Sequence, residues 1–279
     1  MHIVTASIVL YNNALEQIRE CVASLQADYP VQVFLIDNSD QKGHYAALAS
    51  DTVQIIDAPG NIGFGRGHNL ALAPIERLGG AVHLVVNPDI VVTRGSVKAM
   101  ADYVVGHDNV VLVGPKIMSP EGDLYRSCKL LPTPWNLFAR RFMPSYFYAT
   151  ADAKYELQAF RYDRTLEVDC LSGAFLAFCS KTFLAIEGFD SRYFMYLEDV
   201  DICRRAASHG SLVFLPQASV IHEHGQGSYR SFRLLKEHIR SAILYFSRFG
   251  WWRDVERDRL NQAVLARIAA NHIQTSRRA

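Results

Sequence analysis

The sequence predicts an α/β protein whose mostly parallel central sheet is flanked by helices. Short β-branched runs alternate with helical stretches through the first half of the chain. Strands that alternate with helices in this way form parallel βαβ units, whose sheets are covered on both faces. With 279 residues, 49% of them hydrophobic, the chain can bury a stable core without disulfide bonds.

The expected elements follow one another in a regular order in this half. We expect helices over residues 14–26 and 67–78, and strands over 3–10, 31–36, 53–56 and 82–86.

The periodicity breaks down between residues 124 and 162, where a Pro- and aromatic-rich stretch predicts a long irregular or helical excursion. Beyond it, residues 211–216 and 218–221 have the composition of strands.

Residues 229–279 predict a helical extension of a main domain that comprises residues 1–228. The extension is basic, with eleven Lys or Arg against four Asp or Glu from Arg230 onward. The extension either packs on the main domain or docks at a membrane surface through its aromatic and basic end, which contains Trp251 and Trp252. A nucleic-acid partner is not expected, because no reader motif accompanies the basic residues. One helix face carries Leu235, Ile239, Ala242, Ile243 and Phe246.

The cysteines and the first residues bear on the cellular compartment. The cysteines form neither a CxxC pair nor a Cys/His cluster with zinc spacing, which favours reduced thiols. The opening MHIVTASIVLYNN has no signal-peptide pattern, and no stretch reaches the roughly 18 apolar residues of a spanning helix. We therefore expect a soluble, cytoplasmic protein.

Polar residues follow three of the expected strands. Tyr11 and Asn12 follow the first strand, Asp37 follows the second, and Asn87 and Asp89 follow the fourth. Each residue alone is an ordinary turn former. Because parallel strands place their carboxyl ends along one edge, where ligands bind, the recurrence predicts a binding site there.

Asp89 and a pair of histidines are candidate metal ligands. Asp89 supplies a hard oxygen at the end of a buried strand, which suits a divalent cation. His222 and His224 follow a strand-like segment and can lie on one face of it. We expect His222 to be the second ligand, with His224 as the alternative.

Glu198, Asp199 and Asp201 lie within one turn at the expected start of a helix. Capping and the helix dipole account for acids at this place. One of the three acids could instead act as general base toward an acceptor hydroxyl, and position alone does not choose among them.

The segment NIGFGRGHN, residues 61–69, predicts a glycine-rich turn that lets backbone approach a diphosphate. A dinucleotide-binding fingerprint would need glycine at position 68, where the chain has His68, and would follow the first strand. A dehydrogenase is therefore not expected.

Eight ordered motifs together resemble glycosyltransferase family 2, and most of all its rhamnosyltransferase-like members. They cover roughly residues 3 to 228. The motifs are VLYN at 9–12, IDNS at 36–39, NxGFxxGxN at 61–69, NPD at 87–89, SGAF at 172–175, GFD at 188–190, YF at 193–194 and EDxD at 198–201.

The resemblance implies a GT-A fold and a hexosyltransferase that uses a nucleotide diphosphate sugar with Mg²⁺ or Mn²⁺ and inverts the anomeric carbon. Asp199 would be the catalytic base, Asp89 and His222 would bind the metal, and Asp37 would recognise the pyrimidine. Asn87 stands where many relatives have Asp. The implied nucleotide-sugar residues are Tyr11, Asn12, Asp37, Asn61, Gly63, Arg66, Asn69, Asn87 and Asp89, and the implied acceptor-side residues are Glu198, Asp201 and Trp135.

By the same resemblance, the expected donor is dTDP-L-rhamnose, and the acceptor is a lipid-linked surface glycan at the inner face of the cell membrane. UDP-galactofuranose and UDP-N-acetylglucosamine are the alternative donors, because thymine and uracil differ by one methyl group. A non-catalytic nucleotide- or glycan-binding subunit is a further alternative. The presence of Asp89, Asp199 and His222 argues against such a subunit.

Overall fold

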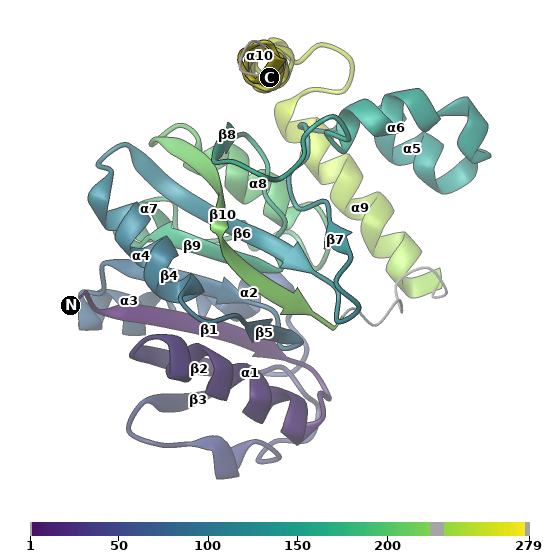
Figure 1. Ribbon diagram of the computed structural model, residues 1–279. Coiled ribbons are helices and arrows are strands. Elements are labelled where there is room, and N and C mark those ends of the chain that lie inside the picture. The colour runs from purple at the N-terminus through teal and green to yellow at the C-terminus, as the bar shows by residue number, and fades with distance from the viewer. Residues whose placement is uncertain (1, 224–231, 277–279) are drawn as a thin grey trace.

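A ten-stranded mixed sheet flanked by helices forms the body of the molecule (Figure 1), whose computed structural model describes residues 2–223 and 232–276. The strand order is β3-β2-β1-β4-β9-β6-β10-β5, with β7 beside β6 and β8 beside β10. The strands are β1 (Val4–Leu10), β2 (Val31–Asp37), β3 (Val53–Asp57), β4 (Val82–Val86), β5 (Ile90–Val92), β6 (Val110–Met118), β7 (Leu124–Tyr125), β8 (Leu166–Val168), β9 (Phe175–Cys179) and β10 (Ser211–His222).

The helices connect these strands and extend beyond them. The expected helix at 67–78 is two short helices, and the Pro- and aromatic-rich excursion is largely helical. The helices are α1 (Leu15–Asp28), α2 (Phe64–Asn69), α3 (Leu72–Leu78), α4 (Ser96–Gly106), α5 (Pro134–Phe142), α6 (Ala149–Tyr155), α7 (Ser180–Ala185), α8 (Glu198–Ala206), α9 (Phe232–Phe249) and α10 (Val255–Ser276), with 3₁₀ turns at Ala46–Leu48 and Ser145–Phe147.

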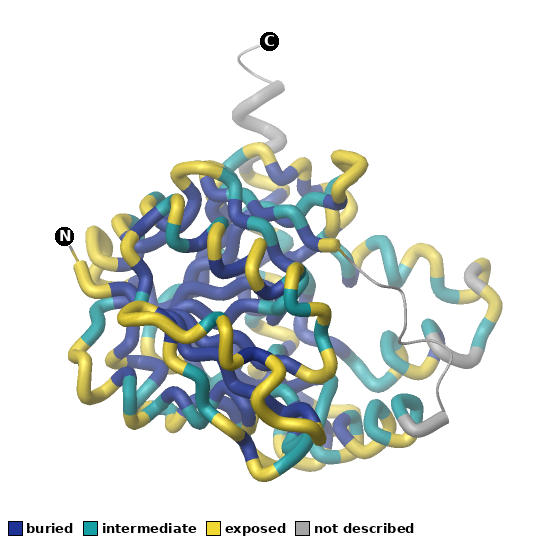
Figure 2. Tube along the Cα trace, turned by 90° about the horizontal axis from the view of Figure 1, so that it is seen from below, coloured by how far each residue is buried: buried dark blue, intermediate teal, exposed yellow. Residues whose placement is uncertain are grey.

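Alternate residues of the central strands pack into two different hydrophobic clusters, one on each face of the sheet. In β1, Ile8 belongs to the cluster that includes Ile18 of α1 and Met100 of α4. Its neighbour Val9 belongs to the cluster that includes Ile75 of α3. This alternation follows from the two-residue period of a strand, and the buried residues accordingly gather along the central strands (Figure 2). The expected covering of both sheet faces is confirmed.

The parallel half and the remainder of the sheet meet at β9. β1 pairs in parallel with β2 and β4, whereas β9 runs antiparallel between β4 and β6. Val86 is opposite Phe175, and the Asn87 N–H then donates to the Ala174 carbonyl at 2.9 Å. The loop before β9 is thereby held at the carboxyl end of β4.

The two segments expected as separate strands, 211–216 and 218–221, form the single strand β10. Its pairing with β6 shifts register between Leu215 and Ser219. Pro216 lies inside the shift and has no N–H to donate to a neighbouring strand, which accounts for the irregularity.

The C-terminal helices pack on the rest of the chain. Phe246 of α9 is buried in a cluster with Leu197, and Val264 of α10 is part of the cluster on one sheet face. The Arg204 guanidinium donates to both carboxylate oxygens of Asp254 at 2.5 and 3.0 Å, and both side chains are buried. The expected boundary at residue 228 lies outside the described residues.

Within residues 2–223 and 232–276, no helix is both long enough and apolar enough to cross a bilayer.

Candidate active site

The ends of β1 and β2 are tied together at the expected ligand-binding edge. The Asn38 N–H donates to the Leu10 carbonyl at 2.8 Å, and the Asn12 N–H donates to Ser39 Oγ at 3.0 Å. Asn12 has a φ of 55°, so the chain turns sharply at this point. Tyr11, which precedes it, is exposed.

One carboxylate oxygen of Asp37 accepts a hydrogen bond from the described part of the protein, and the other does not. The residue is 1% exposed. Oδ1 accepts the Ser39 N–H at 2.8 Å, while the buried Oδ2 has no hydrogen-bond donor among the described residues. A buried acceptor that lacks a protein donor fits a ligand that brings an N–H group.

The glycine-rich turn lies between the end of β2 and the loop before α8. Gly63 has a φ of 93°, and a Cβ there would overlap the Phe194 carbonyl oxygen. The Asn38 amide donates to the Gly63 carbonyl at 3.0 Å, and Asn61 Oδ1 accepts the Gly63 N–H at 3.1 Å. Only glycine fits here, because this φ and the close approach both exclude a side chain.

Asn69 and Arg66 contact the loop that precedes α8. The Asn69 amide accepts the Phe189 N–H at 2.8 Å and donates to the Phe189 carbonyl at 2.7 Å. The Arg66 guanidinium donates to the Ser191 carbonyl. These contacts give both residues a part in positioning the loop, and their expected contact with a nucleotide sugar stays a prediction.

His68, at the missing third glycine, belongs to a buried polar network beneath the site. Ser7 Oγ lies 2.7 Å from His68 Nδ1 and 2.9 Å from His83 Nε2, and Thr5 Oγ1 lies 2.9 Å from His83 Nδ1. Burial lowers the pKa of His83 to about 3 and holds the pKa of His68 well below its usual value. Both rings are therefore neutral and structural.

Asp89 and His222 form the candidate metal centre. Asp89 Oδ1 lies 3.1 Å from His222 Nε2 and receives no hydrogen bond from the part of the chain that the structure describes. Two adjacent ligands of an octahedral ion, each at about 2.1 Å, are about 3 Å apart, so this pair fits a divalent cation. His224 lies outside the described residues.

The protein supplies few ligands beyond this pair. No group of three or more His, Cys, Asp or Glu with metal-binding geometry occurs in the described ranges. Mg²⁺ is commonly held by one or two protein ligands together with water and substrate phosphates. The pair therefore suits a cation that binds together with a diphosphate.

A strained turn places two acids at the start of α8. Tyr196 and Leu197 have φ values of 72° and 62°, a left-handed conformation that is costly for residues other than glycine. Asp199 Oδ2 accepts the Gly173 N–H at 3.3 Å, and Oδ1 accepts the Val200 N–H at 2.9 Å. The turn and these two donors hold the Asp199 carboxylate in one orientation.

Burial separates the protonation states of Glu198 and Asp199. Loss of solvation raises the pKa of Glu198 to about 8, and the charge of Asp199 adds to this rise. Loss of solvation also raises the pKa of Asp199, while Lys129 and the backbone N–H of Gly173 oppose that rise. The pKa of Glu198 therefore lies above neutral pH, whereas the positive charge of Lys129 and the backbone donors favour the ionised form of Asp199.

Asp201 is paired with two arginines and does not line the cavity that Glu198 and Asp199 line, and its expected place on the acceptor side stays a prediction. Its buried carboxylate pairs with Arg205 at 2.7 Å and with Arg248 at 3.0 Å. Arg248 also pairs with Asp190 at 2.8 Å. The acid is thus part of the contact between α8 and α9, in keeping with its expected place at the helix start.

A cavity of about 600 Å³ unites the catalytic candidates. Of the predicted site residues, Asn87, Glu198, Asp199 and His222 line it, and Asp89 adjoins it through His222. Trp135 instead lines a neighbouring groove. The other predicted residues that lie outside the lining are Tyr11, Asn12, Asp37, Asn61, Gly63, Arg66, Asn69 and Asp201.

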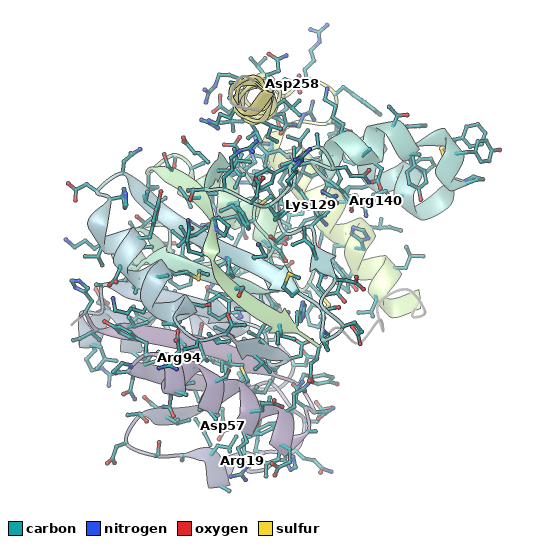
Figure 3. All side chains as sticks on the ribbon, in the orientation of Figure 1. Arg19, Asp57, Arg94, Lys129, Arg140 and Asp258 are labelled. Atoms are coloured by element: carbon teal, nitrogen blue, oxygen red, sulfur yellow. The ribbon has the colours of Figure 1, made fainter. Side chains whose placement is uncertain are left out.

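Sequence reasoning assigned no role to several residues of the cavity. Arg140 of α5 and Lys129, which precedes α5, line it (Figure 3). Ser172 and Gly173 also line it, and the SGAF motif was the signal that could have identified them. Lys129 shows no such signal, because it lies within the stretch of residues 124–162 that has no periodicity.

Two curated relatives align with most of the chain. The N-acetylglucosaminyl-diphospho-decaprenol L-rhamnosyltransferase of Mycobacterium tuberculosis is 30% identical over 248 residues, which cover 82% of this chain and 80% of the relative. Rhamnosyltransferase WbbL of Escherichia coli K12 is 25% identical over 259 residues, which cover 86% and 92%. No protein-family profile matches the sequence.

Solved structures share the fold at low sequence identity. GalNAc-T7 with UDP, GalNAc and Mn²⁺ superposes with a TM-score of 0.63 at 15% identity, over 88% of this chain and about half (49%) of its own. S. aureus TarS 1-349 gives 0.60 at 15% identity, over 99% and 73%. Mannosyltransferase PcManGT from Pyrobaculum calidifontis, with GDP-Man and Mn²⁺, gives 0.54 at 17% identity, over 96% and 75%.

Proposed function

The chain belongs to glycosyltransferase family 2, with the GT-A fold and rhamnosyltransferases as relatives, and on this premise we propose that it transfers L-rhamnose from dTDP-L-rhamnose to a lipid-linked glycan. Both relatives are named as rhamnosyltransferases, and one name specifies an acceptor carried on diphospho-decaprenol. The observation that carries the proposal is that Asn87, Asp199 and His222 line one and the same cavity.

The nucleotide would bind at the edge formed by the ends of β1 and β2. Asp37 Oδ2 is a buried acceptor without a donor in the described structure, which supports contact with the imide N–H of a pyrimidine. Thymine and uracil both carry that N–H. A UDP-sugar is therefore the alternative donor.

Asp89 and His222 would hold Mg²⁺ or Mn²⁺ against the donor diphosphate. Such an ion stabilises the charge that develops on the departing nucleoside diphosphate. Asn87 in place of an acidic residue leaves Asp89 as the carboxylate ligand of the NPD motif. The neighbouring cavity leaves room for the sugar beside these two ligands.

Asp199 would act as the base in a direct displacement. The acceptor oxygen forms a bond to the anomeric carbon as the bond from that carbon to the diphosphate oxygen breaks, and the hydroxyl proton passes to the Asp199 carboxylate. Attack on the face opposite the leaving group inverts the anomeric configuration. The raised pKa of Glu198, about 8, favours its protonated form at neutral pH and supports Asp199 as the base of the pair.

We infer that the enzyme works at the cytoplasmic face of the membrane. A nucleotide-sugar donor and a polyprenol-linked acceptor meet at such a surface. The basic C-terminal extension would favour contact with anionic lipid.

Nucleoside diphosphate release from a series of donors tests the proposal. Purified protein is incubated with Mg²⁺ or Mn²⁺ and with dTDP-L-rhamnose, UDP-galactofuranose or UDP-N-acetylglucosamine, with and without EDTA. We expect release from dTDP-L-rhamnose that stops with EDTA. Asp199→Asn should strongly reduce the release, whereas Asp102→Asn, a change of an exposed acid on α4, should not.

Three results would contradict the proposal. Release from a UDP-sugar alone would show that the donor is a UDP-sugar and not dTDP-L-rhamnose. Release that is unaffected by EDTA would show that the reaction needs no metal ion. Nucleotide binding without turnover, even with lipid-linked acceptors present, would indicate a non-catalytic subunit.

A further inference from the structure

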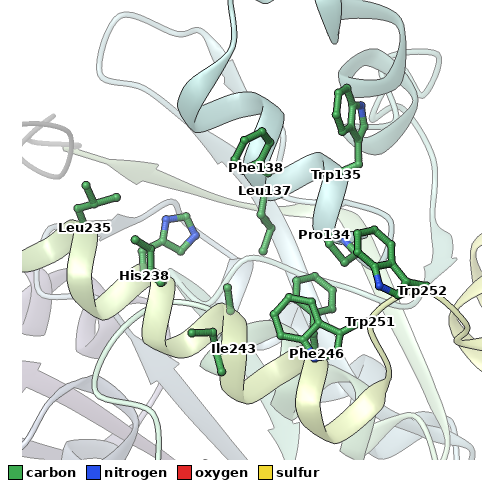
Figure 4. A pocket seen from close by; sticks show the side chains of 12 residues that line it. Pro134, Trp135, Leu137, Phe138, Leu235, His238, Ile243, Phe246, Trp251 and Trp252 are labelled. Atoms are coloured by element: carbon green, nitrogen blue, oxygen red, sulfur yellow. The ribbon is translucent and has the colours of Figure 1, made fainter.

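An apolar groove of about 460 Å³ lies between α5 and α9 (Figure 4). All three tryptophans of the chain line it. Several of its apolar side chains are open to solvent, including Phe138 at 53% and Ile243 at 50% exposure. An exposed apolar concavity of this kind marks a binding site for an apolar ligand or partner. Its lining is Pro134, Trp135, Leu137, Phe138, Leu235, His238, Ile239, Ala242, Ile243, Phe246, Trp251 and Trp252.

The groove is continuous with the catalytic cavity. Leu137 of α5 and Leu235 and His238 of α9 line both spaces. A ligand can therefore extend from the start of α8, where Asp199 lies, along α9 to the tryptophans. This continuity distinguishes the groove from an apolar patch elsewhere on the surface.

The wall of the cavity that adjoins the groove presents positive charge. Lys129 lies on the cavity wall and forms no salt bridge with any carboxylate in the described ranges. Arg140 lies on the same wall, but Glu156 at 2.7 Å and Asp152 at 3.3 Å already neutralise it. Lys129 is thus the cation available to an anionic group of a ligand.

We propose that the groove binds the first isoprene units of the lipid-linked acceptor, with the acceptor diphosphate beside Lys129 and its sugar hydroxyl at Asp199. This inference rests on the proposed function. A sugar joined through a diphosphate to a polyprenol has a polar head, an anionic link and an apolar chain. The cavity with Asp199, the cation of Lys129 on its wall and the adjoining groove supply a site for each of these parts.

Tryptophan fluorescence tests the inference directly, because every tryptophan lies in the groove. Farnesyl diphosphate serves as a short isoprenoid diphosphate, with farnesol and inorganic pyrophosphate as its apolar and anionic parts. We expect a saturable change in emission with farnesyl diphosphate and with farnesol, and none with pyrophosphate. Lys129→Gln should weaken binding of farnesyl diphosphate and leave binding of farnesol unchanged.

A charge placed in the groove provides the matched comparison. Ile243→Glu puts a carboxylate against the isoprenoid and should weaken binding roughly tenfold or more. Val255→Glu changes an exposed apolar residue outside the groove and should bind as the parent does. Circular dichroism and thermal unfolding confirm that both variants fold.

The inference is overturned if farnesyl diphosphate gives no saturable change, or if Ile243→Glu binds as tightly as Val255→Glu. It is also overturned if phosphatidylglycerol vesicles without isoprenoid give the same change as vesicles that contain it, since the groove would then dock on the bilayer itself. Donor hydrolysis by the unaltered protein tests the proposed function separately. Hydrolysis without isoprenoid binding refutes the groove alone, and isoprenoid binding without hydrolysis of any donor refutes the proposed reaction.

Discussion

Asp89 Oδ1 lies 3.1 Å from His222 Nε2 because β5 and β10 pair antiparallel at the end of the sheet. His222 is opposite Ile90, and the Glu223 N–H continues the pairing by donating to the Asp89 carbonyl at 3.0 Å. Residues more than a hundred positions apart are thus aligned by backbone pairing. Their separation depends on this register, in which β10 brings His222 to the end of the NPD motif.

Asp89→Asn should measurably weaken the binding of the metal ion. The change keeps the size of the side chain and removes the negative charge that a divalent cation prefers. We expect the half-saturating Mn²⁺ concentration for donor hydrolysis to rise roughly tenfold or more. Asp108→Asn, at an exposed acid before β6, should leave it unchanged. Equal half-saturation in Asp89→Asn and the parent would exclude Asp89 as a ligand.

The Glu198 and Asp199 pair predicts a distinctive pH profile. Asp199 acts as a base only when ionised, and burial raises its pKa, so activity should fall as the pH drops through that raised pKa. Asp199→Asn should lower kcat by roughly a hundredfold or more at every pH.

Glu198→Gln provides the comparison, because glutamine resembles the protonated acid. The pKa of Glu198 is about 8, so this variant should have nearly parental kcat at neutral pH. The pH dependence of its kcat/KM, measured from about pH 5 to 9, should lack the change on the alkaline side that ionisation of Glu198 causes in the parent protein. A loss at neutral pH as large as that of Asp199→Asn would show that Glu198 itself is the base.

The buried histidines predict acid sensitivity of the fold. His83 and His68 have lowered pKa values in the folded protein, so the unfolded chain binds their protons at a higher pH. Their stabilising effect is complete above the unfolded pKa, about 6.5, and is lost as pH falls below it, by about 1.4 kcal/mol per unit for each ring.

Urea unfolding between about pH 7.5 and 5 measures this slope. His83→Gln, which keeps a side chain able to hydrogen-bond to Ser7, should reduce the slope. His209→Gln, at an exposed residue, should not. An unchanged slope in His83→Gln would contradict the buried neutral state of His83.

The Arg204 and Asp254 pair predicts how tightly the C-terminal helices are held. Both side chains are buried, with exposures of 6% and 4%, so removal of either charge leaves the other uncompensated. We expect Asp254→Asn to lower the free energy of unfolding by about 3 kcal/mol.

The exposed pair Arg259 and Glu256 is the control for this experiment. Glu256→Gln should change stability little, because solvent screens an exposed ion pair. Equal effects of Asp254→Asn and Glu256→Gln in urea unfolding would show that the buried pair does not hold the helices.

The parallel half of the sheet was predictable because its signals are local. Each strand from β1 to β4 is a β-branched run beside a helical stretch, and the expected bounds differ from the structure by few residues. The direction of β9 was not predicted, since an apolar run such as Phe175–Cys179 does not indicate which strands it will pair with.

The site shows the same contrast between local and distant information. Asn87 and Asp199 were assigned from ordered motifs and His222 from its place after a strand-like segment, and the three residues line one cavity. Asp201 was grouped with its neighbours because it is one turn away, but its partner Arg248 lies far along the chain. Charge pattern alone does not reveal such a partner. Lys129 was missed because the chain around it has no periodicity.

The position of β9 also has a consequence for the newly made chain on the ribosome. β4 and β6 are synthesised well before β9, and each has an edge that stays unpaired until residues 175–179 emerge and fit between them. Unpaired strand edges favour association between chains. The nascent protein is therefore most exposed to aggregation during the interval between the emergence of β6 and that of β9, and a pause in translation within residues 119–174 would lengthen that interval.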